Sequence, residues 1–444
     1  MRGMGSNAHI YLSTDVVCGG VLMKNRKTIC MITKWYPTKK NPYNGVFFKE
    51  QAIALAESFD FIVIHYYERK RDFFLQNIIR KLREKEFTIE KINMERNIVE
   101  YNINAFFPFY LVIYDMLYDL YIKVIKHNSN PGVGKYTSNV YKKIKQNILK
   151  KIFTENFSDS VDVFYCVDAQ KESFTLKCAA EAINRPYVVA EHAPFPWPGD
   201  VIKDSEKKAI ETANLFMAIS YDKIRQVLLQ NVKLNNVALV GNLVNEDQFQ
   251  LRHGKNSVKT FLIVAAYSFY KNYDLFVKVF NRLTEITAEP FKVMIVGYGS
   301  NKGYSKNTEE LEEKIKNSKF ADCTEMIKEI AHENIHEVYQ KADAFVMTSI
   351  QEGMPVSALE AGCCGLPIFS TMCGGVEDYV TDEIGKIYKI IDYESFAIGL
   401  KDYLEGKISF DAEYIREYIV ARYGKRSFIG RMTDLFNEVI QKGE

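Results

Sequence analysis

The sequence predicts an α/β protein with two Rossmann-like domains, each a doubly wound parallel sheet, that face each other across a cleft. Three observations predict this class. The chain has 444 residues, which is too long for one ordinary hydrophobic core. Short apolar runs rich in β-branched residues recur without polar alternation, as in strands that are buried on both faces. Helical patterns alternate with these runs, as is typical of parallel sheets.

The predicted strands form two series along the chain. The first series comprises Thr28–Thr33, Phe61–His65, Val161–Val167, Tyr187–Ala190 and Leu215–Ile219, and the second comprises Thr260–Ala265, Lys292–Val296, Ala344–Met347 and Pro367–Ser370. The helices expected between them are Phe48–Glu57, Glu172–Ile183, Tyr221–Gln230, Leu275–Leu283, Thr308–Asn317 and Val356–Cys364. Two such series imply two domains, and open α/β folds bind ligands at the carboxyl ends of their strands.

The expected domain organisation leaves the first residues outside the fold. Residues 1–22 are a leader or a misassigned start, with a secretory signal as the alternative. Residues 23–245 would form the N-terminal domain, with a helical insert near 70–155. Residues 246–411 would form the C-terminal domain. Residues 412–444 are expected to be helical and to cross back to the first domain.

Composition narrows the class of protein. The formal net charge is only +2, so bulk charge does not favour nucleic acid. The eight cysteines form no zinc-ligand cluster and indicate reduced thiols in a cytoplasmic protein. No apolar run reaches the roughly 18 residues that span a bilayer. Residues 121–151 contain eight lysines and no acidic residue. These lysines either contact an anionic membrane surface or are simply solvated.

The most informative segment follows the predicted strand Ala344–Met347. Gly353 allows the backbone to approach a ligand, and Pro355 is expected at the first position of a helix. The amides at this helix start form an anion site suited to a diphosphate. Glu352 before the helix and Glu360 within it could serve two ends of one extended ligand.

The segment Glu352-Gly-Met-Pro-Val-Ser-Ala-Leu-Glu360 resembles the Glu-x7-Glu motif of retaining GT-B glycosyltransferases of family 4, the glycosyl transferases group 1. The resemblance extends over nearly the whole chain after Met23. It implies that Glu352 is catalytic and binds hydroxyls of the donor sugar, and that Glu360 holds ribose hydroxyls. The backbone expected to line the sugar and diphosphate is that of Gly353, Met354, Pro355 and Val356. The alternative is an ordinary helix start with two surface glutamates.

Other segments of the second half follow the family order. The resemblance implies that Lys271 contacts the donor pyrophosphate as a point charge, and a solvated turn lysine is the alternative. The family often has an arginine where this chain has Ala266, so part of the phosphate neutralisation is missing or supplied elsewhere. Gly297 and Gly299 follow a strand, and the resemblance implies that the base or ribose lies against them. A plain strand-end turn is the alternative.

The first half supplies two further candidates. Gly45 precedes a helix in a segment that resembles the family's first loop, which implies an approach to the donor phosphate. A surface turn is the alternative. His192 resembles the histidine that reaches the donor sugar, and Glu191 could orient its ring. A purely structural histidine is the alternative. Asn242 matches the asparagine of the family's hinge and is expected to structure that turn rather than to bind a ligand.

The resemblance implies a retaining, metal-independent glycosyltransferase that needs no cofactor. Its partners would be a nucleotide-diphosphate sugar and a glycan or lipid-linked acceptor, in the cytoplasm or at the inner face of an anionic membrane. Two alternatives stay open. A nucleotide-sugar epimerase on the same fold would form product without an acceptor. A degenerate nucleotide-sugar-binding protein would bind without turnover, and Ala266 keeps this alternative open.

Overall fold

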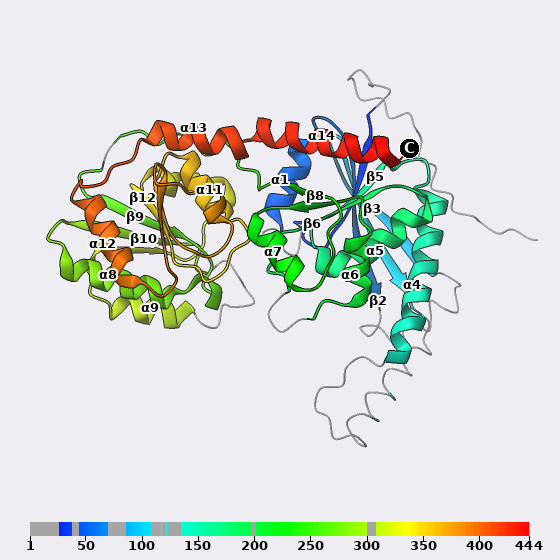
Figure 1. Cartoon of the computed structure of the whole chain (residues 1–444), viewed down its shortest axis with the longest axis horizontal. Helices are drawn as coiled ribbons and strands as arrows, with labels where there is room; N and C mark the ends of the chain where they lie inside the picture. Colours follow the sequence, from blue (N-terminus) through cyan, green and yellow to red (C-terminus); the bar gives the residue numbers. More distant parts are fainter. Residues whose placement is uncertain are drawn as a thin grey trace, which may run out of the picture. The chain divides into compact units, whose positions relative to one another are not determined.

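The computed structural model in Figure 1 describes residues 26–37, 44–69, 86–107, 117, 121, 135–196, 201–254, 256–299 and 308–443. Its strands form one sheet of eight strands and one of six. The expected α/β class with two largely parallel sheets is therefore confirmed. The predicted leader 1–22 lies outside the described residues.

Contacts between residues divide the chain into two compact units. The first unit comprises Met1–Val167, Lys171–Val189 and Phe436–Glu444. The second unit comprises Asp168–Gln170 and Ala190–Leu435. The predicted domain boundaries at residues 22, 245 and 411 stay predictions.

The eight-stranded sheet has the strand order β3-β4-β2-β1-β5-β6-β7-β8. Its strands are β1 Thr28–Ile32, β2 Asp60–Arg69, β3 Phe87–Glu95, β4 Ile98–Phe106, β5 Val163–Cys166, β6 Tyr187–Glu191, β7 Leu215–Ala218 and β8 Val237–Leu239. The helices along the same part of the chain are α1 Val46–Leu55, α4 Lys135–Asn156, α5 Ala169–Ala182, α6 Asp204–Glu211 and α7 Tyr221–Leu229. Every residue of β5 and β7 is buried, which explains why these strands are apolar without alternation.

A β-hairpin corrects the predicted helical insert near 70–155. Strands β3 and β4 pair antiparallel, and Arg96 between them has a positive φ of 52°. Apolar and polar residues alternate along much of both strands, and a period of two suits a strand rather than a helix. The insert is therefore partly β-structure, whereas Lys135–Asn156 is helical as expected. Residues 70–85 lie outside the described part of the chain.

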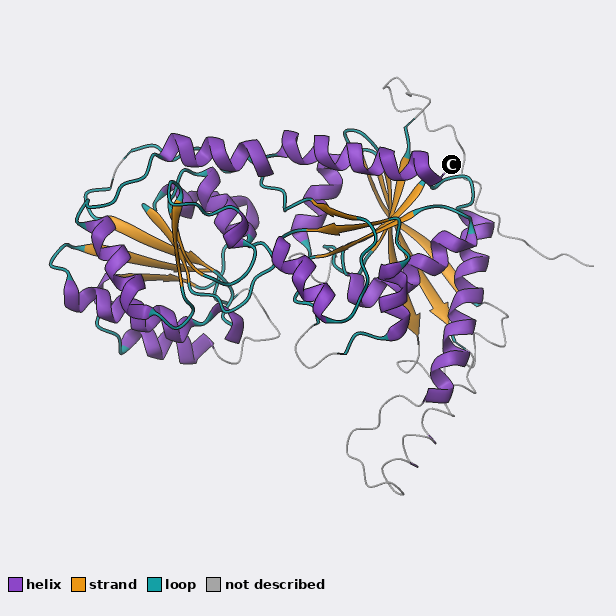
Figure 2. Ribbon diagram, viewed as in Figure 1, coloured by secondary structure: helices purple, strands orange, loops and turns teal. Residues whose placement is uncertain are grey.

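The six-stranded sheet has the order β11-β10-β9-β12-β13-β14, and all five neighbouring pairs of strands are parallel. Its strands are β9 Lys259–Val264, β10 Phe291–Val296, β11 Thr324–Ile327, β12 Ala344–Met347, β13 Ile368–Thr371 and β14 Gly385–Tyr388. The helices that follow or connect them are α8 Tyr273–Ile286, α9 Thr308–Lys316, α10 His336–Gln340, α11 Val356–Cys363, α12 Tyr393–Leu404, α13 Ala412–Tyr423 and α14 Lys425–Gly443. Figure 2 shows helices flanking these strands.

One face of the six-stranded sheet is covered by amphipathic helices. Helix α8 packs against α12, and the buried side chains of α8 include Phe276, Val279, Phe280 and Leu283. Their spacing of three and four residues places them on one face of the helix. They join strand residues such as Phe261 and Val293 in one hydrophobic core. This core holds the strands in register, so that their carboxyl ends present loops along one edge.

The predicted C-terminal helical segment forms two helices, α13 and α14, with Gly424 between them. The last residues of α14 belong to the first unit. There the ring of Phe436 makes edge contacts with Phe59 and Tyr165, at centroid distances of 5.8 and 5.4 Å. This end of the chain therefore contributes to the apolar core of the first unit.

Candidate functional site

Loops at the carboxyl ends of β9, β12 and β13 are joined by hydrogen bonds. The amide of Ile350 after β12 donates to the carbonyl of Tyr270 after β9 at 2.7 Å. The hydroxyl of Thr371 at the end of β13 donates to the carbonyl of Ser349 at 2.6 Å. Parallel strands bring their carboxyl ends to one edge, where open α/β folds place ligand sites. The site residues predicted from the second half of the chain follow these strand ends.

Two predicted site residues form an ion pair. Lys271 ends the short helix η1 (Phe269–Lys271), and its ammonium nitrogen lies 2.6 Å from Oε1 of Glu352. Their side chains are 26% and 14% exposed, so both stay accessible from solvent. The amide of Glu352 donates to the carbonyl of Cys373 at 2.7 Å, which ties its loop to the loop after β13. The structure thus brings together the residues predicted for pyrophosphate and sugar.

Glycines allow the two loops to approach each other closely. Gly375 has a φ of 72°, and a Cβ there would lie 2.0 Å from the carbonyl oxygen of Gly353. A Cβ at Gly353 would lie 2.8 Å from the carbonyl oxygen of His192. No side chain larger than hydrogen fits such approaches without a shift of the backbone. The close packing of the loops around Glu352 therefore requires glycine at positions 353 and 375.

The start of α11 differs by one residue from the prediction. Pro355 is the N-cap, with extended backbone at φ −69° and ψ 114°, and the helix begins at Val356. No side-chain hydrogen bond caps this helix among the described residues. Since the first-turn amides of a helix have no partner within it, they form an electropositive site suited to an anion. The predicted anion site lies here, directly after the loop of Glu352.

Glu360 is buried within α11 and has a partner that the sequence analysis missed. The hydroxyl of Tyr339 donates to Oε2 of Glu360 at 2.6 Å and lies 3.2 Å from the carbonyl oxygen of Ser357. Burial and the neighbouring carboxylate raise the pKa of Tyr339, so it remains a donor. Tyr339 therefore fixes the orientation of the carboxylate that is predicted to hold the ribose. No local pattern in the sequence indicates this contact.

His192 is joined to the loop of Glu352 through Asn242. Nδ2 of Asn242 donates to the carbonyl oxygen of Met354 at 2.8 Å. This bond fixes the orientation of the amide, so its Oδ1 faces Nδ1 of His192 at 3.1 Å. Since Oδ1 only accepts, Nδ1 must carry the proton. The ring is then the neutral Nδ1–H tautomer, and its Nε2 is an acceptor. Asn242 structures this turn as expected, and it also sets the tautomer of His192.

Electrostatics keep His192 neutral. Burial lowers its pKa to about 3, and the ammonium of Lys223 contributes in the same direction, whereas Asn242 opposes both. A neutral ring with Nε2 as acceptor can receive a hydrogen bond from a hydroxyl. It cannot supply a positive charge to a phosphate near neutral pH.

The other predicted glycines have clear backbone roles. Gly45 is the N-cap of α1 with a φ of 65°, and a Cβ there would lie 2.5 Å from the carbonyl of Trp35. Gly297 has a φ of 77° and donates its amide to Ile327 at 2.8 Å. Gly299 donates to the carbonyl of Lys328 at 2.9 Å, and a Cβ would meet that side chain at 2.6 Å. These contacts explain the glycines by local packing, and a ligand role for each stays a prediction.

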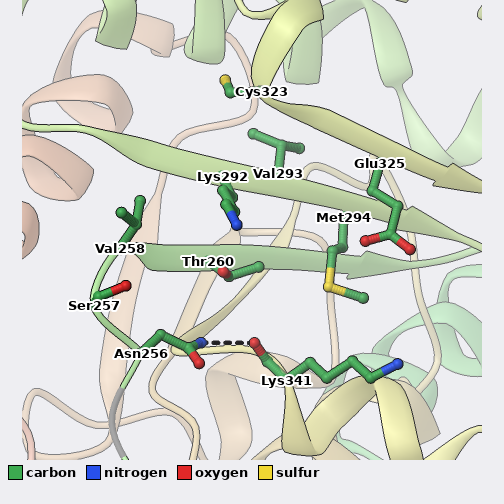
Figure 3. A pocket seen from close by; sticks show the side chains of 10 residues that line it. All are labelled: Asn256, Ser257, Val258, Thr260, Lys292, Val293, Met294, Cys323, Glu325 and Lys341. Carbon is green, nitrogen blue, oxygen red and sulfur yellow. Dashed lines mark hydrogen bonds between the residues drawn. The ribbon is translucent and has the colours of Figure 1, made fainter.

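A pocket of about 270 Å³ lies away from these residues (Figure 3). Its lining includes Ser257 and Thr260 from the start of β9, Lys292 from the start of β10 and Lys341 before β12. It therefore lies at the amino-terminal ends of the strands, opposite the edge that carries Lys271.

Within the described ranges, no group of three or more His, Cys, Asp or Glu side chains could hold a metal ion. No helix in the part of the chain that is described is long and apolar enough to cross a membrane.

Comparison with known proteins finds a family model and several curated relatives that match part of the chain. Residues 244–419 match the family described as glycosyl transferases group 1. A curated relative, the mannosylfructose-phosphate synthase of Agrobacterium fabrum, is 32% identical over 108 residues, which are 24% of each chain. The chain spans between 24% and 54% of the length of the curated relatives that it matches.

Solved structures share the fold of the whole chain. The lipopolysaccharide outer core galactosyltransferase WaaB has a TM-score of 0.62 and 15% identity, and the match covers 93% of this chain and 99% of that one. The structure of HepE from Anabaena in complex with UDP-glucose has a TM-score of 0.61 and 12% identity, and the match covers 93% and 99%. At these identities the likeness shows the fold alone. The predicted GT-B architecture and the family resemblance of the second half are both confirmed.

Proposed function

We propose that this protein transfers a sugar from a nucleotide-diphosphate sugar to an acceptor hydroxyl, and the match of residues 244–419 to the glycosyl transferases group 1 supports this proposal. The transfer would retain the anomeric configuration and would need no metal ion or cofactor. The observation that carries the proposal is the Lys271–Glu352 ion pair beside the uncapped start of α11. A cation, a carboxylate and the amides at a helix start thus lie together at the carboxyl edge of the six-stranded sheet.

The leaving diphosphate would be stabilised by fixed positive groups. A reaction without a metal must meet the developing charge with cations and backbone N–H groups. Lys271 supplies a compact charge, and the start of α11 supplies amides with a favourable dipole. The ammonium of Lys271 is held by Glu352. A diphosphate would compete for this ammonium, and the carboxylate would then turn to the sugar.

The sugar would lie against Glu352, His192 and the backbone from Gly353 to Val356. A carboxylate accepts hydrogen bonds from hydroxyls, and Nε2 of the neutral His192 ring accepts another. Glu360, oriented by Tyr339, would accept from the ribose hydroxyls. Gly297 and Gly299 would leave room for the base or ribose. Each role rests on the position of the residue at the carboxyl edge and on the chemistry of its side chain.

The proposal that the donor is a nucleotide sugar is tested by measuring which nucleotide sugars bind the protein. Since HepE carries UDP-glucose, UDP-sugars are the first candidates, followed by GDP-, ADP- and CMP-sugars. A ligand that binds the folded state raises the melting temperature in proportion to its affinity. The expected result is a rise with one nucleotide class and a transfer activity that Glu352→Ala abolishes. No rise with any nucleotide sugar would overturn the proposal.

The same assay separates the two alternatives. An epimerase would convert the donor without an acceptor, and product formed in its absence would favour that activity. A binding protein would show the rise in melting temperature but no turnover with any acceptor. The alanine at position 266, where the family often has arginine, is the feature that keeps this last outcome open.

We also propose that the acceptor is lipid-linked or part of a cell-surface glycan. Helix α4 supports an acceptor that is held at a membrane, because the helix has one charged face. Lys143, Lys150 and Lys151 are exposed on it, whereas Ile148 and Ile152 are buried. Exposed lysines attract anionic lipids. Replacing the three lysines by glutamate should abolish flotation with anionic liposomes. The control replaces three exposed lysines elsewhere, Lys278, Lys292 and Lys316, and undiminished flotation of the α4 variant would contradict the idea.

A further inference from the structure

A buried pair of charged side chains holds the segment that follows β6. The amide of Ala193 donates to Oε1 of Glu191 at 2.8 Å, and the carbonyl oxygen of Ala193 accepts a hydrogen bond from the ammonium of Lys223. Both side chains are wholly shielded from solvent. The residue that follows Glu191 in the chain is His192. The backbone on the carboxyl side of His192 is thus fixed by an acid and a base.

Two glutamines continue this arrangement along the same segment. Nε2 of Gln170 donates to the carbonyl of Pro194 at 3.0 Å. Oε1 of Gln226 accepts from the amide of Phe195 at 3.0 Å and from Lys223 at 2.9 Å. Side chains, rather than a neighbouring strand, therefore satisfy the backbone of these residues. We call Glu191, Lys223 and Gln226 the clamp.

The free-energy cost of removing the charged groups of the clamp from water indicates that they have a role other than stabilising the fold. Two buried ionisable side chains are weak evidence for stability, because the desolvation of charged groups offsets much of their attraction and apolar replacements are often neutral. Burial raises the pKa of Glu191 and lowers that of Lys223, and each charge counteracts the shift of the other. Lys223 lies on the buried face of α7 with Gln226 and Val227, where an apolar residue would be usual.

We propose that Lys223 and Glu191 are positioning residues, which hold the backbone beside His192 so that its ring meets the donor sugar. Asn242 restrains the ring, and the clamp restrains the backbone that carries it. The carbonyl of His192 would lie 2.8 Å from a Cβ at Gly353, so a shift of this segment reaches the loop of Glu352. The inference rests on the proposed function, because it assigns His192 to the sugar.

The matched variants separate positioning from charge balance. Lys223→Met removes the bond to Ala193 and leaves Glu191 without the neighbouring ammonium. The double variant Glu191→Gln, Lys223→Met removes both ionisable groups and keeps an acceptor for the Ala193 amide. Lys207→Met is the control, since Lys207 also donates from its ammonium to a backbone carbonyl, that of Gln230 at 2.7 Å. Melting temperatures identify any variant that fails to fold.

The first readout compares nucleotide binding with sugar transfer. The double variant should bind UDP as wild type does, while its kcat with UDP-glucose falls about tenfold to a hundredfold, since small misplacements of a binding group have effects of this size. Lys207→Met should keep wild-type kcat. A double variant with wild-type kcat would overturn the inference. A wild-type chain that neither binds nor transfers any nucleotide sugar would instead overturn the proposed function.

The second readout does not depend on activity. In protein with ¹⁵N-labelled histidine, the ring of His192 should show one neutral tautomer with the proton on Nδ1, and His192→Gln assigns its signals. In the double variant we expect averaging between the two tautomers, because the ring loses its fixed distance to Asn242. A single unchanged Nδ1–H tautomer in the folded double variant would overturn the positioning role, whatever the enzyme's substrate is.

Discussion

The ammonium nitrogen of Lys271 lies 2.6 Å from Oε1 of Glu352, although the two residues are 81 positions apart in the chain. A bond between two ionised groups is short and strong. It holds the ammonium of Lys271 beside the carboxylate. If a donor diphosphate binds Lys271 as proposed, it would compete with Glu352 for this ammonium, and we expect donor binding to be linked to release of the carboxylate.

Removing the cation should weaken nucleotide binding. Lys271→Met is expected to raise the Kd for UDP about tenfold to a hundredfold, because a hydrogen bond to a charged group is lost. Titration calorimetry measures the change. The control is Lys278→Met, which removes an exposed lysine of α8. Equal Kd values for the two variants would show that Lys271 does not meet the diphosphate.

Removing the carboxylate should separate binding from transfer. Glu352→Gln removes the negative charge that holds the ammonium of Lys271, so UDP should bind at least as tightly as it does to wild type. Transfer should fall about a hundredfold or more, since the loss of one preorganised polar group in an active site has effects of this order. Calorimetry with UDP and initial rates with the nucleotide sugar give the two values. Weaker UDP binding by this variant would contradict the competition between diphosphate and carboxylate.

The hydroxyl of Tyr339 should support nucleoside binding. Tyr339→Phe removes the hydrogen bond that its hydroxyl donates to a buried oxygen of Glu360, and it should lower the free energy of unfolding by about 1–3 kcal/mol. The Kd for UDP should rise several-fold because the carboxylate loses its orientation. Tyr403→Phe removes a similar bond, to the carbonyl of Asp343 at 2.8 Å, and should leave UDP binding intact. Loss of UDP affinity in both variants would indicate a general effect on the fold.

Gly375→Ala should lower the free energy of unfolding by more than the cost of placing an alanine in a left-handed backbone conformation. Gly375 and Gly254 both have positive φ, 72° and 88°, but only a Cβ at Gly375 meets another atom, at 2.0 Å. Gly254→Ala should cost about 1–2 kcal/mol for the left-handed backbone. Gly375→Ala should cost several kcal/mol and reduce UDP-sugar binding. Denaturant unfolding measures the free energy of unfolding of both variants. Equal losses would mean that the loops of Gly353 and Gly375 can move apart without strain.

The neutral state of His192 predicts a dependence of stability on pH. Its pKa falls to about 3 in the folded chain, against about 6.5 in an unfolded one. Between these values the unfolded chain binds the proton, so stability falls as pH decreases, by at most about 1.4 kcal/mol per pH unit. His192→Gln should flatten this slope between pH 6.5 and the onset of acid unfolding. An unchanged slope would contradict the neutral buried ring.

Local patterns account for much of the correct prediction. The runs at Thr28–Thr33, Ala344–Met347 and Pro367–Ser370 contain strands because continuous apolar, β-branched sequence suits burial on both faces of a sheet. Pro355 marks the start of α11, with an error of one residue, because its fixed φ and missing donor fit only the first turn. The hairpin of β3 and β4 contradicts the expected helical insert, because polar and apolar residues alternate along much of these strands with the period of a strand.

The sequence by itself determined the α/β class and the alternation that builds both sheets, and it singled out Glu352, Glu360 and Lys271 as candidate site residues. These features are encoded by neighbours in the chain. Only the tertiary structure decided that Lys271 pairs with Glu352, that Tyr339 orients Glu360 and that Lys223 is buried beside His192. These contacts depend on strand order, because β9 and β12 are adjacent in the sheet but far apart in the chain. No local period records which distant loops meet, so packing alone brings those side chains together.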